Sequence, residues 1–211
     1  MTSEMLLGLV VDGQAEYHSL PHIYRKLSGI CTVIDPPLYC DIQPSAPTKQ
    51  NALKIVEKAK LLVAKGAQHI LVVYDKEQQH FCPKLVADEL AQEVANRLTS
   101  IGIKSLVSVV LKVRKYENWL IADCNALQQS GRFKKVRKIR QQVCRNKADS
   151  VLDAAALLGK HSISGSYDKK GDSVAITQKM DPMVVALNSR SFRRFLRVVG
   201  IQKYMNQSKR P

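Results

Sequence analysis

Two short apolar runs, each followed directly by an acidic residue, constrain the fold of this chain more than any other feature. Residues 6–11 read Leu-Leu-Gly-Leu-Val-Val and precede Asp12, and residues 69–74 read His-Ile-Leu-Val-Val-Tyr and precede Asp75. Uninterrupted apolar runs of this length are typical of strands that are buried on both faces of a parallel sheet. We therefore expect two such strands, with an acidic side chain at the carboxyl end of each.

Segments with helical periodicity follow both runs. Apolar residues recur every three or four positions in residues 20–27, 53–63 and 85–98, which predicts an amphipathic helix in each segment. Pro21 is expected in the first turn of its helix, where a missing backbone N–H does no harm. Residues 103–113 form a further strand-like run. Strands that alternate with helices predict an α/β fold with a mainly parallel sheet and helices on both of its faces.

The regular alternation weakens after about residue 125. We predict an α/β domain in residues 1–125 and a basic, mostly helical extension in residues 126–211 that packs on the same core. No apolar run reaches the roughly 18 residues that a membrane span needs. The five cysteines are scattered and include no C-x-x-C pair, which fits a reducing compartment. We therefore expect a cytoplasmic protein without a membrane partner.

The formal net charge of +15 favours a polyanionic partner, which would be DNA, RNA or an acidic protein surface. Residues 132–147 contain eight Lys or Arg residues and no acidic residue, which predicts an amphipathic helix whose basic face contacts phosphates. A face that is merely solvated, or one that binds an acidic protein, stays an open alternative. The candidate nucleic-acid contacts in this segment are Arg132, Lys134, Lys135, Arg137, Lys138 and Arg140.

A second basic stretch, residues 190–197, adds Arg193 and Arg194 to the candidate nucleic-acid contacts. Phe192 and Phe195 stand between its arginines at the spacing of an inward helical stripe. We interpret these two aromatic residues as core anchors rather than as platforms on which bases stack. Neither basic segment contains a motif for sequence-specific recognition of nucleic acid.

Acidic residues stand at, or just beyond, three predicted strand ends, and ligands of open α/β sheets bind beyond those ends. Clustered carboxylates raise one another's pKa unless a cation compensates, and oxygen ligands with few imidazoles suit Mg²⁺ or Mn²⁺ rather than zinc. We expect four of these residues to bind the metal and Glu117 to line the same crevice. The three pairs are Asp12 with Glu16, Asp75 with Glu77, and Glu117 with Asp123, of which the first two pairs would be the metal ligands.

Two other interpretations of these acids stay open. Acidic residues that follow strands commonly form turns or cap helices without binding any ligand. A phospho-acceptor receiver also gathers aspartates at the ends of parallel strands. It needs two acids after the first strand and a lysine at a later strand end, and the order of elements in this chain does not suit it well.

Three of the acidic stretches resemble motifs of the TOPRIM domain family. Residues 11–16 are similar to the first TOPRIM motif of nucleases of the overcoming-lysogenization-defect type, and residues 72–77 to the second, an Asp-x-Asp after a strand. Residues 116–123 resemble the Glu-x-Trp-Leu-x-Ala-Asp signature of a TOPRIM-like family of about this length. The C-terminal signature of that family resembles Tyr167-Asp168-Lys169, Ala175-Ile176, Asp181 and residues 191–196 of this chain.

The resemblance implies a Rossmann-like TOPRIM fold in which the first acid is a general base or metal ligand and the second motif holds Mg²⁺. Asp12 stands here in place of the usual glutamate and Glu77 in place of the second aspartate. Both substitutions keep the negative charge, and each changes the length of the side chain by one methylene group. We expect Lys169 and Lys170 to contact nucleic acid, and one of them to stabilise the phosphate in the transition state.

The function implied by the resemblance is a Mg²⁺-dependent nuclease that acts on DNA or RNA. Members of the family are often encoded beside ATPases in prokaryotic defence or mobile-element loci, so an ATPase is an expected partner. The alternative is a catalytically inactive TOPRIM-like module, which would bind nucleic acid or the ATPase through its basic surface.

Overall fold

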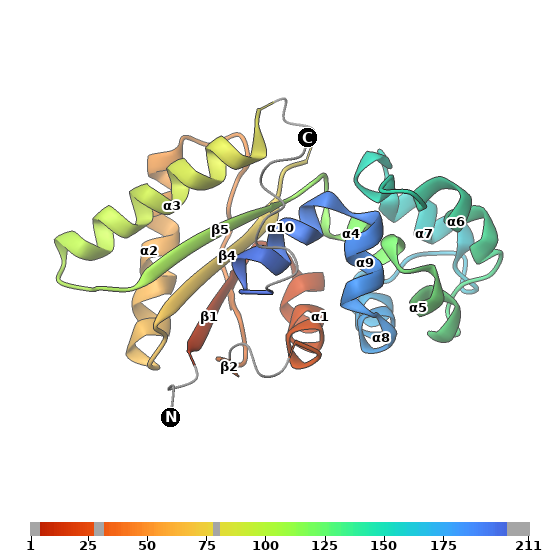
Figure 1. The fold of residues 1–211 in the computed structure, drawn as a ribbon, viewed down its shortest axis with the longest axis horizontal. Coiled ribbons are helices and arrows are strands. Elements are labelled where there is room, and N and C mark those ends of the chain that lie inside the picture. The colour runs from red at the N-terminus through yellow and green to blue at the C-terminus, as the bar shows by residue number, and fades with distance from the viewer. Residues whose placement is uncertain (1–4, 28–31, 78–80, 202–211) are drawn as a thin grey trace.

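A computed structural model describes residues 5–27, 32–77 and 81–201 and has a five-stranded sheet at its centre (Figure 1). The strands pair in the order β2-β1-β4-β5, and β3 pairs with β1 beyond the end of β2. All the pairings are parallel, which confirms the expected α/β fold with a parallel sheet flanked by helices. The strands are β1 (Leu6–Val11), β2 (Thr32–Val33), β3 (Leu38–Tyr39), β4 (His69–Asp75) and β5 (Leu106–Lys112).

Helices cover both faces of the sheet, which explains why its central strands are apolar without interruption. Helices α2 and α3 pack on one face, whereas α1, α4 and α10 lie on the other (Figure 1). The first helices are α1 (Gln14–Arg25), α2 (Thr48–Ala64), α3 (Pro83–Ser100), α4 (Tyr116–Ala122) and α5 (Cys124–Gln129). They are followed by α6 (Val136–Val143), the 3₁₀ helix η1 (Ala148–Ser150), α7 (Ala154–His161), α8 (Gly171–Lys179), α9 (Pro182–Asn188) and α10 (Arg190–Val198).

Successive residues of a strand point to opposite faces, and the two hydrophobic cores follow that alternation. Val11 and Val73 belong to the core under α1 and α4, whereas Val10 and Val72 belong to the core under α2 and α3. All four side chains are fully buried. Burial of each such side chain contributes about 1.5–3 kcal/mol, so the central strands anchor both layers of helices.

The C-terminal helices pack into the hydrophobic core that also contains one face of the sheet. Trp119 of α4 is fully buried and packs edge-on against Phe192 of α10, with ring centroids 5.0 Å apart. Phe195 is buried against the same indole, at 5.3 Å. The interpretation of these phenylalanines as core anchors is therefore confirmed. Residues of β1 and of α10 belong to one continuous hydrophobic cluster.

Two local expectations about helices are wrong. Pro21 lies in the interior of α1, because that helix begins at Gln14 and not shortly before the proline. The earlier start places Glu16 in the first turn, at the price of one backbone hydrogen bond, which proline cannot donate. The basic segment is also less helical than expected, since α6 covers only residues 136–143 of the 132–147 stretch.

In the described part of the chain, no helix has both the length and the apolar character that crossing a bilayer requires. The cysteines at 40, 82, 124 and 144 are free thiols.

Candidate functional site

The ends of β1 and β4 bring three carboxylates together. Asp12 follows β1 directly, Asp75 is the last residue of β4, and Glu16 projects from the first turn of α1. The register of the two parallel strands pairs Val11 with Val73, so their carboxyl ends lie at the same edge of the sheet. One oxygen from each carboxylate lies within 4.8 Å of the others. Three of the expected acids, Asp12, Glu16 and Asp75, therefore lie together at this edge of the sheet.

A lysine that the sequence analysis did not single out lies at the centre of this cluster. Lys112 is the last residue of β5, and its Nζ lies 2.8 Å from Asp12 Oδ1 and 3.0 Å from Asp75 Oδ1. The same Nζ also donates a hydrogen bond to Glu16 Oε1. The lysine side chain is 0% exposed, whereas that of Asp75 is 21% exposed, so the cluster opens to solvent on the Asp75 side.

Burial and charge act against each other in this cluster. Burial is the largest influence on Asp75 and raises its pKa to about 8, against the lowering effect of Lys112. Burial likewise raises the pKa of Glu16. For Lys112, burial alone would lower the pKa, but the three surrounding carboxylates together raise it well above its ordinary value. One ammonium is thus shared among three acidic side chains, and further positive charge would favour their ionised forms.

Short-range contacts hold the acids in place. Asp12 Oδ2 accepts a hydrogen bond from the backbone N–H of Asp75 at 2.7 Å, which ties the ends of β1 and β4 together. Gly13 allows Glu16 to approach, because a Cβ at Gly13 would collide with the Glu16 carboxylate. The Asp-Gly-x-x-Glu spacing of the sequence thus has a geometric reason, since the glycine is the position over which the glutamate turns back toward the strands.

The remaining predicted acids do not join the cluster. Glu77 is exposed and lies outside the group of close carboxylates, although its backbone N–H still donates a 2.7 Å hydrogen bond to the Arg114 carbonyl beside the end of β5. Its predicted role as a metal ligand stays a prediction that the described group of carboxylates does not support. Glu117 is buried in the first turn of α4, outside the group of close carboxylates. Asp123 caps α5 and accepts a 2.8 Å hydrogen bond from the backbone N–H of Asp181, which is the structural role that acids after strands often have.

The donor set of the cluster fits a hard cation. Its ligand atoms are carboxylate oxygens, which are the donors that Mg²⁺ and Mn²⁺ prefer. Asp75 Oδ1 is buried and has no hydrogen-bond partner besides its ion pair with Lys112. A divalent ion would therefore be held by Asp12, Glu16 and Asp75, in competition with the ammonium of Lys112.

Lys112 was not predicted as a site residue because it lies inside the mostly apolar strand-like run of residues 103–113, beside no acidic residue of that run. A single lysine at the end of an apolar strand, in line with acids at two other strand ends, is the signal that could have found it. The same lysine meets one requirement of a phospho-acceptor receiver.

Most predicted nucleic-acid contacts are exposed, as such contacts need to be. Arg137 and Lys138 extend from the solvent-facing side of α6, and Arg140 donates a 2.8 Å hydrogen bond to Asn125. Arg132 forms an ion pair with buried Asp172, at 3.1 Å. The other exposed residues of the predicted set are Lys134, Lys135, Lys169 and Lys170, none of which contacts the carboxylate cluster in the described structure.

Arg193 and Arg194, the last two predicted nucleic-acid contacts, lie far along the chain on α10 and are half-buried. Arg193 donates hydrogen bonds to the backbone carbonyl of Ala186 and to the side chain of Asn146. Both arginines line a pocket at the side of the sheet. Their surroundings therefore differ from those of the exposed residues on α6.

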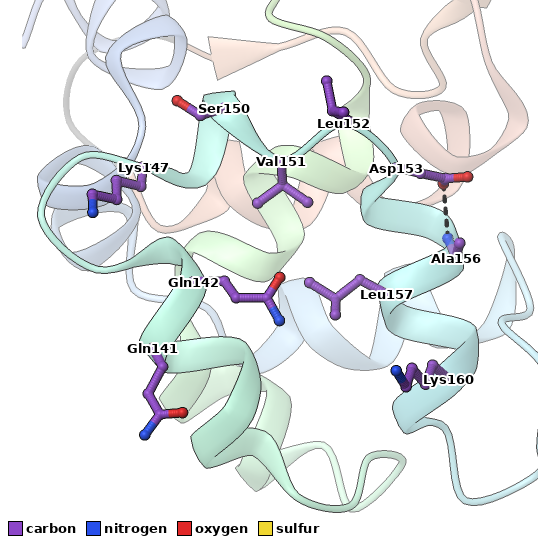
Figure 2. A pocket seen from close by; sticks show the side chains of 10 residues that line it. All are labelled: Gln141, Gln142, Lys147, Ser150, Val151, Leu152, Asp153, Ala156, Leu157 and Lys160. Carbon is purple, nitrogen blue, oxygen red and sulfur yellow. Dashed lines mark hydrogen bonds between the residues drawn. The ribbon is translucent and has the colours of Figure 1, made fainter.

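A separate hollow of about 640 Å³ lies between α6, η1 and α7 (Figure 2). Gln142 and Leu157 point toward each other across it, and its one acidic side chain, Asp153, accepts a 2.9 Å hydrogen bond from the backbone N–H of Ala156. That carboxylate is engaged as the N-cap of α7. Its described walls bring together no set of acids or nucleophiles, so the strand ends remain the better candidate site.

Comparisons with known proteins give one match. The model of a family described as a domain of unknown function (DUF4276) matches residues 13–199, which cover most of the chain and two of the three clustered acids, Glu16 and Asp75. No curated protein and no solved structure matches.

Proposed function

The chain belongs to the DUF4276 family, and on that premise we propose that it is a Mg²⁺-dependent phosphodiesterase of the TOPRIM type that acts on nucleic acid. The observation that carries the proposal is the group of three carboxylates at the carboxyl ends of adjacent parallel strands. Open α/β sheets bind their ligands at this edge, and clustered carboxylates are the usual magnesium ligands of enzymes that act on phosphates.

The residues of the cluster would divide the chemical work. Asp12, Glu16 and Asp75 would hold the ion, which supplies charge neutralisation on the phosphate and a lowered pKa of bound water. Asp75 is the most exposed of the three and faces the opening of the cluster, so it is positioned to orient a water molecule. Lys112 keeps the carboxylates together before the metal arrives, because it offsets part of their mutual repulsion.

The basic surface supports a nucleic acid as the substrate. The chain has 33 Lys and Arg residues against 18 Asp and Glu residues, and α6 presents Arg137 and Lys138 to solvent. Such a surface attracts phosphate backbones without reading their sequence. A cytoplasmic location, a role in defence and an ATPase partner stay predictions that derive from the family resemblance.

The proposal is tested by cutting assays on supercoiled plasmid, single-stranded DNA and RNA with Mg²⁺ or Mn²⁺. Wild-type protein should cut at least one of them, and Asp75→Asn should reduce the rate by about a hundredfold or more, since a bound metal contributes several kcal/mol to transition-state stabilisation. Glu57→Gln is the matched control, because Glu57 is an exposed acid on α2. Equal cutting by wild type and Asp75→Asn would remove the cluster from the mechanism.

Lys112 favours a second candidate, the catalytically silent module. Its ammonium already lies among the three carboxylates and could take the place of a metal permanently. Calorimetric titration with Mn²⁺ separates the two candidates. Heat that disappears in Asp75→Asn supports the phosphodiesterase, whereas no heat at millimolar metal, for wild type and for Lys112→Gln alike, supports the silent module.

A further inference from the structure

Helix α10 carries its arginines on one face. Arg190, Arg193, Arg194 and Arg197 follow one another at spacings of three, one and three residues, which places them on the same side of a helix. The opposite side, with Phe192 and Phe195, is fully buried in the core beneath the sheet. The arginine face is therefore held in a fixed orientation by the packing of the aromatic face.

The arginine face forms one wall of a pocket of about 520 Å³. This volume lies within the range of about 300–1,000 Å³ that is common for small-ligand sites. Figure 1 shows α10 beside β5, and the pocket reaches from there to the beginning of α3. Leu111 and Val113, the neighbours of Lys112, form part of its floor. The cationic side chains of its walls are Lys76, Lys84, Arg190, Arg193, Arg194 and Arg197.

Little negative charge within the pocket offsets these cations. Asp149 is the single acid of the walls, and its carboxylate is engaged by Ser189 Oγ at 2.7 Å and by the Ser191 backbone N–H at 2.8 Å. Arg194 pairs with Asp88 at 3.2 Å, a surface acid that is half exposed. Arg197 has no acidic partner among the described residues. The pocket is therefore a concave surface with a large excess of positive charge.

The beginning of α3 adds hydrogen-bond donors to the same pocket. Cys82 is the N-cap of this 18-residue helix, and its side chain makes no capping hydrogen bond to the first turn that would remove those donors. The N–H groups of the first turn, together with the helix dipole, therefore favour an anion at this point of the pocket.

We infer that the pocket between α3 and α10 binds a phosphomonoester, as carried by a mononucleotide or by the 5′ end of a nucleic acid strand. A phosphomonoester carries more charge than the diester phosphates inside a strand and has three acceptor oxygens, so it gains more from converging guanidinium groups and helix N–H donors. This inference is independent of the carboxylate cluster and holds whether or not the chain cuts nucleic acid.

The test compares two single-stranded DNA oligonucleotides of one sequence, with a 5′-phosphate and with a 5′-hydroxyl, by fluorescence anisotropy in the presence of EDTA so that neither is cut. Wild-type protein should bind the phosphorylated strand at least about tenfold more tightly. Arg197→Gln and Lys84→Gln should each remove most of that preference. The control is Arg137→Gln on α6, which should weaken binding of both strands by the same factor and leave the preference intact.

Competition with deoxyadenosine 5′-monophosphate distinguishes the two sources of the phosphate. Displacement of the strand by the mononucleotide identifies a small ligand, whereas a preference for the phosphorylated strand without displacement identifies a strand end. Equal affinity of wild type for the two strands overturns the inference. So does a preference that survives in both pocket variants when their thermal midpoints match that of wild type. Cutting without any 5′-phosphate preference would overturn this inference alone, and a preference without cutting would overturn the proposed function alone.

Discussion

The two ends of β4 each hold a titratable residue, and these residues differ in whether a partner of opposite charge contacts them. At the carboxyl end, Asp75 contacts Lys112, whose ammonium is also bound by Asp12 and Glu16. At the amino end, His69 is 2% exposed, and neither of its ring nitrogens has a hydrogen-bond partner. The difference follows from their surroundings, because an opposite charge meets Asp75, whereas burial of His69 without a partner favours its neutral form.

Removal of Lys112 should have the largest effect on stability. Lys112→Met leaves three close carboxylates without their cation, and removal of one partner from a buried ion pair costs about 3–5 kcal/mol. The free energy of unfolding, measured by urea denaturation, should fall by that amount at neutral pH. Lys104→Met is the matched control, because Lys104 is an exposed lysine that precedes the same strand.

A second substitution sharpens this prediction. Asp75→Asn in the Lys112→Met background removes an acid that would otherwise stay buried without its cation and should restore part of the lost stability, so the two changes should be non-additive. Additive effects would mean that Lys112 stabilises the fold by the packing of its aliphatic stem rather than by its charge.

The amino end of β4 should make stability depend on pH. Burial lowers the pKa of His69 from 6.5 to about 4, so between these values the unfolded chain binds a proton that the folded chain does not. The free energy of unfolding should therefore fall as the pH drops from about 6.5 to 4, by ~3 kcal/mol at most. His69→Leu should remove this contribution. An unchanged difference between pH 7 and pH 4.5 in that variant would show that His69 has a partner in solution.

Trp119 offers the intermediate case of a neutral buried group that has a partner. Its indole Nε1 donates a 2.7 Å hydrogen bond to Ser191 Oγ. Ser191→Ala should lower the free energy of unfolding by about 1–3 kcal/mol, because the indole N–H would be left without an acceptor. The chain has one tryptophan, so its fluorescence reports this site directly during urea denaturation. Ser166→Ala, at an exposed serine, should leave the unfolding midpoint where it is.

Exposed charge should have the smallest effect on stability. The double substitution Arg137→Gln, Lys138→Gln on α6 should leave the thermal midpoint unchanged, because both side chains lie in solvent. If both contact phosphates, the slope of log affinity for duplex DNA against log salt should become shallower by about two. An unchanged slope would assign nucleic acid binding to another part of the surface.

The sheet and part of the site were open to prediction from sequence. The run of residues 6–11 coincides with β1, and the acids placed after the first two runs, Asp12 and Asp75, lie in one cluster. This succeeded because a strand buried on both faces leaves an uninterrupted apolar signal, and because parallel strands bring their carboxyl ends to one edge.

Features that depend on tertiary structure could not be predicted in the same way. Glu77 follows β4 as closely as the spacing requires, but it lies outside the group of close carboxylates, and no local pattern predicts the positive φ of its backbone. Two of the three partners of Lys112, Asp12 and Glu16, lie more than 90 residues away from it along the chain. The pocket between α3 and α10 needs five segments in their final places, because Lys76 and residues 146–150 line it together with parts of α3, β5 and α10.

The shared core of β1 and α10 has a consequence for how the protein is made. One face of the sheet emerges from the ribosome with its first strand, whereas Phe192 and Phe195, which help to cover it, are synthesised near the end. A nascent chain therefore carries an uncovered apolar surface for most of its synthesis, a condition that invites aggregation or chaperone binding. Production of residues 1–125 alone would make that exposure permanent, so expression of the full chain is the route to material that stays in solution.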